Sequence, residues 1–298
     1  MFKPIPYILV GKRREEIIDQ FAAFNEELEK ARRMQMALLR PTDIQLPDSL
    51  DVGVMLKQSR TVGGDLFMFS TYEHTFRFII TDVCGKGMTA ALYMSAINHI
   101  LRTIDNQNLP PAEFCNVLNR EMCGLNIDGM FMTMITGIID MKNGKVTYVN
   151  AGHMPPIYWP SAGNPDFFAT NADVPIGVIE DYDYTETSEQ LNKFDTVILY
   201  TDGILDSVNE FEECYGKERL INAVSKTISR TSTDIIATVS KDIRAFNKDI
   251  IQADDMVLMS FCYNGTEMFE QATVPLSESI NEIPISDKEV LNEIQITF

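Results

Sequence analysis

The chain has 298 residues, and its 25 Lys and Arg against 43 Asp and Glu give a formal net charge of −18. This acid excess argues against binding nucleic acid or an anionic membrane through a general basic surface, because phosphates need Lys and Arg side chains facing them. With 45% apolar and 23% charged residues, the chain can bury a sizeable core and is too apolar to be disordered. No apolar run reaches about 18 residues, so we expect no insertion into a membrane.

The cysteines and the first residues indicate a cytoplasmic protein. The five cysteines are scattered and form no C-x-x-C motif, which predicts neither a disulfide framework nor a zinc cluster. We expect them to be small buried side chains in a reducing compartment. The charged run at 12–16 follows the apolar opening instead of preceding it, which is the reverse of a secretory signal.

A long helix is predicted over residues 14–40, which contain no Gly or Pro. Spacings of four and three alternate along one seam of this segment, as in a heptad repeat. The seam consists of Ile17, Phe21, Phe24, Leu28, Ala31, Gln35 and Leu38. Two interpretations stay open: a helix docked on its own domain, or a two-stranded coiled coil that makes a homodimer or carries a signal. In a coiled coil, Gln35 would fix the register at some cost in stability.

Strands and helices alternate in groups after Pro41. We expect a strand at 52–56, hairpins at 65–70 with 75–83 and at 131–141 with 145–150, helices at 88–104 and 110–123, a strand at 195–200, helices at 217–229 and 233–246, and a strand at 256–262. Because the strands come mostly in hairpins and the helices in pairs, the pattern predicts an α+β fold with mainly antiparallel sheets covered by helices.

Three segments are expected along the chain. An N-terminal segment with the long helix covers 1–43, one globular domain covers 44–265, and a polar, acidic tail covers 266–298. The tail still contains scattered isoleucines, so it is either additional edge structure or the beginning of something that the chain does not complete.

Four aspartates lie at the ends of apolar strands. Asp65 follows two glycines, Asp82 and Asp202 each end a strand, and Asp254 precedes one. A single Asp-Gly at a strand end is usually a turn, but a buried strand end is a costly place for a charge. Four such placements are best explained if the strand ends converge and cations hold the carboxylates together.

Oxygen-only ligands indicate a particular metal chemistry. Without a nearby His or Cys, the aspartates favour Mg²⁺ or Mn²⁺ over zinc. Two such ions a few ångströms apart would activate a water molecule and clamp phosphoryl oxygens.

The motifs around these aspartates also resemble a known family. In chain order they are Gly-Gly-Asp-Leu-Phe at 63–67, Thr-Asp-Val-Cys-Gly-Lys-Gly-Met-Thr-Ala-Ala-Leu at 81–92, Asn-Ala-Gly-His-Met-Pro-Pro at 150–156, Leu-Tyr-Thr-Asp-Gly-Ile at 199–204, Asn-Glu-Phe-Glu-Glu-Cys-Tyr-Gly-Lys-Glu-Arg-Leu at 209–220 and Asp-Asp-Met-Val-Leu-Met at 254–259. As a set they resemble the stage-II-sporulation-E-like, sigma-regulator branch of the PP2C-type metal-dependent protein phosphatases. The resemblance covers residues 50–263, and 31–41 resembles the linker helix that precedes such domains.

The resemblance implies a β-sandwich flanked by helices and the hydrolysis of phosphoserine or phosphothreonine on a protein. Asp82 then resembles the aspartate that bridges two Mn²⁺ or Mg²⁺ ions, assisted by the Val83 carbonyl. Asp202 and Asp254 resemble ligands of one ion each, and Asp65 takes the place of an acidic residue that holds metal through water. The implied substrate is a phosphorylated anti-sigma-factor antagonist.

Two departures from the eukaryotic relatives are visible. Those relatives have a histidine shortly after the bridging aspartate, where this chain has Val83-Cys84-Gly85-Lys86. No general acid is therefore assigned. A basic residue that grips phosphate in the eukaryotic relatives also has no obvious counterpart.

Lys86 and His153 are further candidates for binding substrate. Lys86 lies among glycines at a predicted helix start, where free N–H groups hold anions; the alternative is an exposed lysine without a role. His153, in the motif at 150–156, either contacts substrate or braces a turn of the scaffold.

Two other functions are weighed against the phosphatase. The first is a non-catalytic signalling or dimerisation module with the same fold. The second is a dinucleotide-binding oxidoreductase, because Gly85-x-Gly87-x-x-Ala90 follows a strand and opens a helix. Asp82 would put a carboxylate beside the pyrophosphate, and the flanking hairpins do not match a parallel nucleotide-binding unit.

Overall fold

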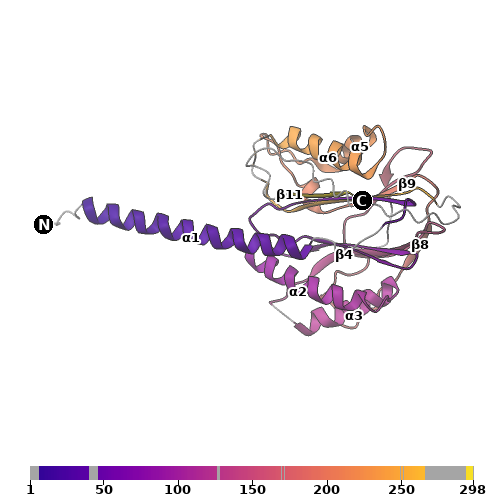
Figure 1. The fold of residues 1–298 in the computed structure, drawn as a ribbon, viewed down its shortest axis with the longest axis horizontal. Coiled ribbons are helices and arrows are strands. Elements are labelled where there is room, and N and C mark those ends of the chain that lie inside the picture. Colours follow the sequence, from indigo (N-terminus) through magenta and orange to yellow (C-terminus); the bar gives the residue numbers. More distant parts are fainter. Residues whose placement is uncertain are drawn as a thin grey trace, which may run out of the picture.

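Two antiparallel sheets lie face to face with helices on their outer faces, and one long helix projects from the body (Figure 1). The structure is a computed structural model that describes residues 7–39, 46–125, 128–168, 170, 172–248, 250, 252–265 and 293–297. The predicted α+β sandwich is confirmed.

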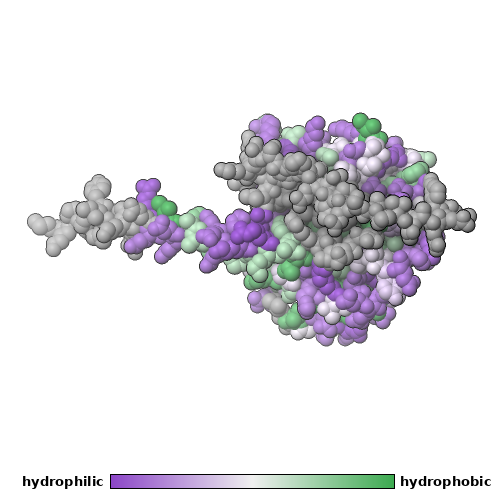
Figure 2. Space-filling model, viewed as in Figure 1, coloured by the Kyte–Doolittle hydropathy of each residue, from purple (hydrophilic) through white to green (hydrophobic). Residues whose placement is uncertain are grey.

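The projecting helix α1 (Tyr7–Leu39) is the predicted long helix. Its C-terminal part is anchored on the domain, where Gln35, Met36 and Leu39 are buried. Its outer part exposes Phe21 and Phe24 of the predicted seam, and apolar side chains stand among hydrophilic ones along this arm (Figure 2). Docking on the chain's own domain therefore holds for the last turns of α1 only.

The first sheet has five strands in the order β2-β3-β4-β5-β8. They are β2 (Leu66–Tyr72), β3 (Thr75–Val83), β4 (Met132–Asp140), β5 (Lys145–Ala151) and β8 (Thr187–Gln190). The two expected hairpins supply β2 to β5, and Asp82 of β3 stands opposite Thr133 of β4. Helices α2 (Met88–Asp105) and α3 (Pro111–Leu125) cover its outer face (Figure 1).

The second sheet has six strands in the order β11-β1-β10-β9-β6-β7. They are β11 (Glu293–Thr297), β1 (Leu50–Lys57), β10 (Met256–Tyr263), β9 (Asp195–Tyr200), β6 (Ile157–Trp159) and β7 (Asp166–Phe167). Helices α5 (Gly216–Ser225) and α6 (Ser232–Asn247) cover its outer face (Figure 1). The tail's β11 pairs with β1, so these five residues form edge structure, whereas the tail residues 266–292 lie outside the described residues.

Several elements differ from the sequence prediction. The short strands β6, β7 and β8 were not predicted, because two to four residues are too few to show a period-2 pattern. The helix expected at 217–229 ends at Ser225. A short helix, α4 (Asp202–Leu205), begins at Asp202 itself.

Two apolar cores hold the layers together. One lies between the sheets and beneath α2 and α3, and the Phe78 and Phe261 rings, 4.9 Å apart, join the two sheets within it. The other lies between the six-stranded sheet and helices α5 and α6, where Leu220, Ile236 and Val239 are fully buried. Because both faces of the six-stranded sheet are covered, all residues of its central strand β10 are buried. In the part of the chain that the structure describes, no helix is long and apolar enough to span a membrane.

Candidate active site

Asp65, Asp82, Asp202 and Asp254 gather at one end of the sandwich. Asp82 lies near the end of β3, Asp202 opens α4 directly after β9, and Asp254 precedes β10. The carboxyl groups of Asp65 and Asp82 lie within hydrogen-bonding reach of each other, and Asp202 and Asp254 both repel the charge on Asp82. Segments far apart in the chain thus converge as the sequence predicted.

Burial and mutual repulsion shift the acidity of this cluster. Burial, followed by the charge of Asp202, raises the pKa of Asp82 to about 7. Burial and the neighbouring carboxylates Asp82 and Asp255 raise the pKa of Asp65 well above its usual value. Burial and the charge of Asp254 also raise the pKa of Asp202. Removing these charges from water while holding them together is unfavourable, and cations would relieve the repulsion.

The donor atoms fit a divalent cation that prefers oxygen. The Oδ2 atom of Asp65 is buried and has no hydrogen-bond partner among the described residues, so this oxygen is available as a ligand for a cation. The side chains do not form a closed cage: within the described ranges, no group of three or more His, Cys, Asp or Glu side chains is ready to hold a metal ion. The set of oxygens fits Mg²⁺ or Mn²⁺ by its chemistry.

Asp255 has a different position from Asp254, and the sequence did not distinguish them. Its carboxylate accepts hydrogen bonds from the backbone N–H of Ser59 (2.7 Å), the Ser59 hydroxyl (3.0 Å) and the backbone N–H of Gly64 (2.8 Å). A Cβ on Gly63 would lie 2.0 Å from Asp255 Oδ2, so only glycine allows this approach. Asp255 therefore fastens the loop before Asp65 to the start of β10.

The second glycine contact sets the position of Asp202. A Cβ on Gly203 would lie 1.9 Å from the carbonyl oxygen of Asp255, so the backbones of α4 and of the segment before β10 are in direct contact. On the opposite side, a Cβ on Gly64 would lie 3.4 Å from the carbonyl oxygen of Val83. The glycines beside the aspartates thus permit close packing of two pairs of backbone segments.

Lys86 contacts one of the predicted metal ligands. Its Nζ lies 2.6 Å from Asp254 Oδ2 and donates to the carbonyl oxygen of Ala253 at 3.1 Å. The hydrogen bond to Asp254 raises the pKa of Lys86. This ammonium is therefore not an isolated surface charge; it neutralises part of the acidic cluster.

Arg60 is a basic residue at the cluster that the sequence analysis did not identify. It lies exposed in the loop that Asp255 fastens. The charge of its guanidinium opposes part of the rise in the pKa of Lys86, which shows that the two basic groups are close. The Nη1 atom of Arg60 would be 3.1 Å from a Cβ on Gly87. No local sequence pattern marks Arg60, five residues before Asp65, as a site residue, because the path of the loop alone brings its side chain to the cluster.

His153 is buried behind the cluster. Its Nδ1 lies 2.7 Å from the Thr133 hydroxyl, and its backbone N–H and carbonyl both bond to the Asn150 side chain. Burial lowers the pKa of His153 to about 4, opposed by a hydrogen bond to the backbone of Tyr200. Because the ring is enclosed, these contacts support the scaffold interpretation of His153 over contact with substrate.

Comparison with known proteins agrees with this architecture. The Stage II sporulation protein E (SpoIIE) family matches residues 72–264, more than half of the chain. Phosphoserine phosphatase RsbU of Bacillus subtilis (strain 168) is 30% identical over 185 residues, which cover 62% of this chain and 55% of that protein. Phosphoserine phosphatase RsbP of the same organism is 27% identical over 227 residues, covering 74% and 55%. The chain spans about half the length of these curated relatives.

Solved structures show the same fold. The SiaA-PP2C domain of Pseudomonas aeruginosa has a TM-score of 0.72 at 18% identity, covering 82% of this chain and 98% of that one. The PP2C phosphatase domain of SpoIIE from Bacillus subtilis, with a fragment of its regulatory domain, has a TM-score of 0.63 at 18% identity, covering 73% and 64%. The chain therefore has a PP2C fold and belongs to the stage II sporulation protein E family.

Proposed function

We propose that this chain is a metal-dependent protein serine/threonine phosphatase. The observation that carries the proposal is the convergence of four aspartates from separate segments. Burial, followed by the charge of a neighbouring carboxylate, raises the pKa of Asp65, of Asp82 and of Asp202. Two relatives named phosphoserine phosphatases support the reaction, and a PP2C-fold neighbour, RsbX, is described in complex with magnesium.

Two Mn²⁺ or Mg²⁺ ions are proposed for the cluster. Asp82 would hold both, with help from the Val83 carbonyl, while Asp202 and Asp254 would each hold one and Asp65 would act through water. When bound, the ions would supply the Lewis acidity that attack by water on a phosphoryl group needs. The Lys86 ammonium forms an ion pair with Asp254. If that carboxylate held a metal ion instead, the ammonium would be available to the substrate's phosphate.

Arg60 is proposed to bind the substrate's phosphate. Its guanidinium is exposed at the rim of the cluster, near Lys86 and the glycines before α2. A planar guanidinium can donate two parallel hydrogen bonds to phosphoryl oxygens. Arg60 would then orient the phosphoryl group over the carboxylates, and Lys86 would provide a second positive charge.

The first test is hydrolysis of an aryl phosphate and of a phosphoserine peptide. We expect phosphate release that requires Mn²⁺ or Mg²⁺ and is abolished in Asp82→Asn and in Asp202→Asn. Asp48→Asn, at an exposed position outside the cluster, is the matched control and should keep full activity. Full activity in both cluster variants would exclude this mechanism.

The proposed substrate is a phosphorylated anti-sigma-factor antagonist in a partner-switching pathway, and the proposed location of the protein is the cytoplasm. Support comes from the resemblance of the motifs and from family membership. The discriminating measurement is kcat/KM for such a phosphoprotein beside a phosphoserine peptide of the same local sequence. Equal values would show that the enzyme does not recognise this folded partner.

The alternative is a non-catalytic module of the same fold. It predicts that the carboxylates do not bind divalent cations, and calorimetric titration with Mn²⁺ separates the two cases. An oxidoreductase with a parallel dinucleotide-binding unit is excluded by the sheet, because β3 pairs antiparallel with both β2 and β4.

A homodimer through α1 is also proposed. Phe21 and Phe24 are 65% and 48% exposed on the projecting arm, and Ile17 is 60% exposed. Their heptad spacing would form an apolar seam with a second copy of the helix. Analytical ultracentrifugation of the full chain tests this association.

A further inference from the structure

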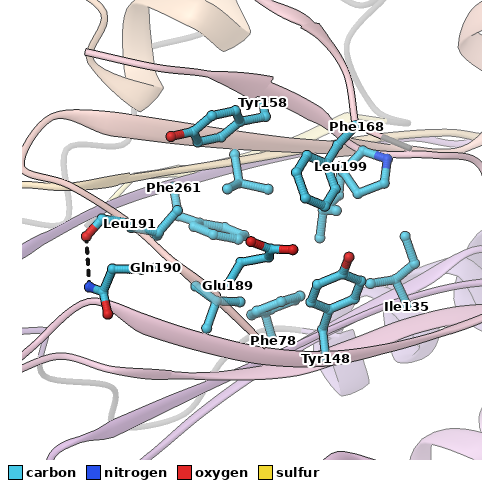
Figure 3. Close-up of a pocket in the computed structure, with 13 residues that line it drawn as sticks. Phe78, Ile135, Tyr148, Tyr158, Phe168, Glu189, Gln190, Leu191, Leu199 and Phe261 are labelled. Carbon is cyan, nitrogen blue, oxygen red and sulfur yellow. Dashed lines mark hydrogen bonds between the residues drawn. The ribbon is translucent and has the colours of Figure 1, made fainter. Parts of the chain in front are cut away.

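Strands β9 and β10 pair side by side up to the edge of the carboxylate cluster. Within the paired part, Leu199 and Phe261 line an aromatic cavity between the two sheets, and none of the four aspartates lines it (Figure 3). The pairing ends where Tyr200 stands opposite Leu258. The next residue, Thr201, is fully buried, although it carries a hydroxyl group.

The Thr201 hydroxyl takes the place of a main-chain acceptor. The Thr201 N–H donates to the Val257 carbonyl at 3.1 Å, and the Val257 N–H donates to the Thr201 hydroxyl oxygen at 2.8 Å. A threonine in the N-cap position of a helix usually accepts from the first turn of that helix. Thr201 is the N-cap residue of α4 but makes no such bond with α4, all of whose residues are described. Its side chain therefore serves β10 and not its own helix.

The hydroxyl of Thr201 still has a hydrogen to donate. An oxygen that accepts from Val257 keeps its own O–H as a donor, and a buried donor without an acceptor is costly. The Asp65 carboxylate, which is 3% exposed, lies within hydrogen-bonding reach of this hydroxyl.

Separate contacts bring the segments of Asp65 and Thr201 together. The Gly64 N–H, next to Asp65, donates to the Asp255 carboxylate at 2.8 Å. Asp255 comes two residues before Val257, which is bonded to Thr201. The loop before Asp65 and the turn into α4 are thus both fastened to the same short segment at the start of β10.

We propose that Thr201 is a positioning residue of the carboxylate cluster, whose hydroxyl donates to Asp65 and restricts the rotation of that carboxylate. The inference rests on the proposed function, since it concerns how the cluster is arranged for cations. The Oδ2 atom of Asp65 has no hydrogen-bond partner among the described residues. A carboxylate held by Thr201 would present this oxygen to the site in a fixed orientation.

Thr201→Val keeps the shape of the side chain and removes the hydroxyl. Calorimetry on the full chain should show Mn²⁺ binding weakened by about tenfold, as when a group that orients a metal ligand is removed. Thr201→Ser keeps the hydroxyl and should bind Mn²⁺ nearly as tightly as the unaltered chain.

Thr136→Val is the matched control for this change. Thr136 is also fully buried, and its hydroxyl has no hydrogen-bond partner among the described residues. It lies on β4 in the other sheet. Its replacement should leave Mn²⁺ binding unchanged.

A double-mutant cycle without metal separates a bond to Asp65 from a merely structural role. The free energy of unfolding is measured in EDTA for the unaltered chain, Thr201→Val, Asp65→Ala and the double variant. Loss of the acceptor for the Val257 N–H should destabilise the protein in both backgrounds. The bond to Asp65 can be lost only where Asp65 is present, so Thr201→Val should destabilise the unaltered chain more than it destabilises Asp65→Ala.

Three results would each overturn the proposal. They are equal destabilisation by Thr201→Val in both backgrounds, unchanged Mn²⁺ affinity in Thr201→Val, and the same loss of Mn²⁺ affinity in Thr201→Ser. If the unaltered chain bound no Mn²⁺, the proposed function would fail instead. The cycle in EDTA needs no metal, so it would still decide whether Thr201 holds Asp65.

Discussion

Gln35 of the projecting helix and Gly63 of the loop before Asp65 are joined by two hydrogen bonds in opposite directions. The Gln35 amide donates to the Gly63 carbonyl at 2.8 Å, and the Gly63 N–H donates to the Gln35 Oε1 at 3.2 Å. Gln58 also donates to that Oε1, at 2.7 Å. Because Gln35 is 4% exposed, its bonds have little competition from water. These hydrogen bonds therefore fix the C-terminal part of α1 to the loop before Asp65.

Replacing Gln35 with Leu should loosen this link. The substitution leaves the buried N–H and carbonyl of Gly63 without partners, at a cost of about 1–3 kcal/mol in the free energy of unfolding. We also expect a higher Mn²⁺ concentration for half-maximal phosphatase activity, because Asp65 would be less well positioned. Urea denaturation and Mn²⁺ titration measure the two effects.

The control for this change is Gln20→Leu, which alters the same residue type at an exposed position of α1. It should change neither quantity. An unchanged Mn²⁺ requirement in Gln35→Leu would show that the helix contact does not influence the site.

Asp82→Asn should have opposite effects on stability with and without metal. Without divalent cations the variant should melt at a higher temperature than the unaltered chain, because it removes a buried charge repelled by Asp202 and Asp254. With Mn²⁺ only the unaltered chain should gain further stability, since a ligand that binds the folded state raises the melting temperature. Thermal unfolding with EDTA and with Mn²⁺ is the measurement, and a lower melting temperature for the variant in EDTA would contradict the repulsion.

Arg60→Gln should weaken substrate binding more than metal binding. Losing a charge-assisted hydrogen bond costs about 1.5–3 kcal/mol, so kcat/KM for a phosphoprotein should fall by roughly ten- to a hundredfold. Arg60→Lys should retain part of the activity, because it keeps the charge without the fork of donors. Steady-state kinetics combined with Mn²⁺ calorimetry test this, and a loss of Mn²⁺ affinity equal to the loss of activity would count against a phosphate-binding role.

His153 should make stability depend on pH in the acidic range. Its pKa in the folded protein is about 4, against a usual value of 6.5, so the unfolded chain takes up a proton first as the pH falls. Stability is therefore fully present above about pH 6.5 and is lost on the way down to pH 4. Between pH 7 and 5 the loss from this group is about 2 kcal/mol.

The measurement is urea denaturation at both pH values for the unaltered chain and for His153→Gln. The variant should lack this component of the pH dependence. The exposed His74 supplies the control, since His74→Gln should retain it, and identical pH dependence in all three proteins would refute the assignment.

Charged residues on the outer part of α1 should weaken a dimer. In Phe21→Glu with Phe24→Glu, the proposed apolar seam would carry like charges opposite each other. Because both side chains are exposed in the single chain, the fold itself should tolerate the change. Sedimentation equilibrium should show a monomer, whereas the same mass for both proteins would place any association elsewhere.

Local signals were sufficient for most of the architecture. Alternating apolar residues and the Asn143-Gly144 turn predicted the hairpin of β4 and β5, and the heptad seam predicted α1. The predicted C-terminal end of α5 was wrong, since the helix ends at Ser225 and not at Ser229. Where a helix ends depends on how the following residues pack, which local sequence does not fix. The short strands β6, β7 and β8 are held by hydrogen bonds to neighbouring strands, which their own sequence pattern does not reveal.

The sequence by itself determined which residues could form the site, because an aspartate at the end of an apolar strand is locally recognisable. Only the tertiary structure decided how their neighbours act. Asp255 bonds to Gly64 and Ser59 across more than 190 residues of chain, and Gln35 reaches Gly63 from a separate helix. The aromatic cavity likewise requires rings from both sheets. Such contacts arise from the packing of distant segments, for which no periodicity or turn motif leaves a trace.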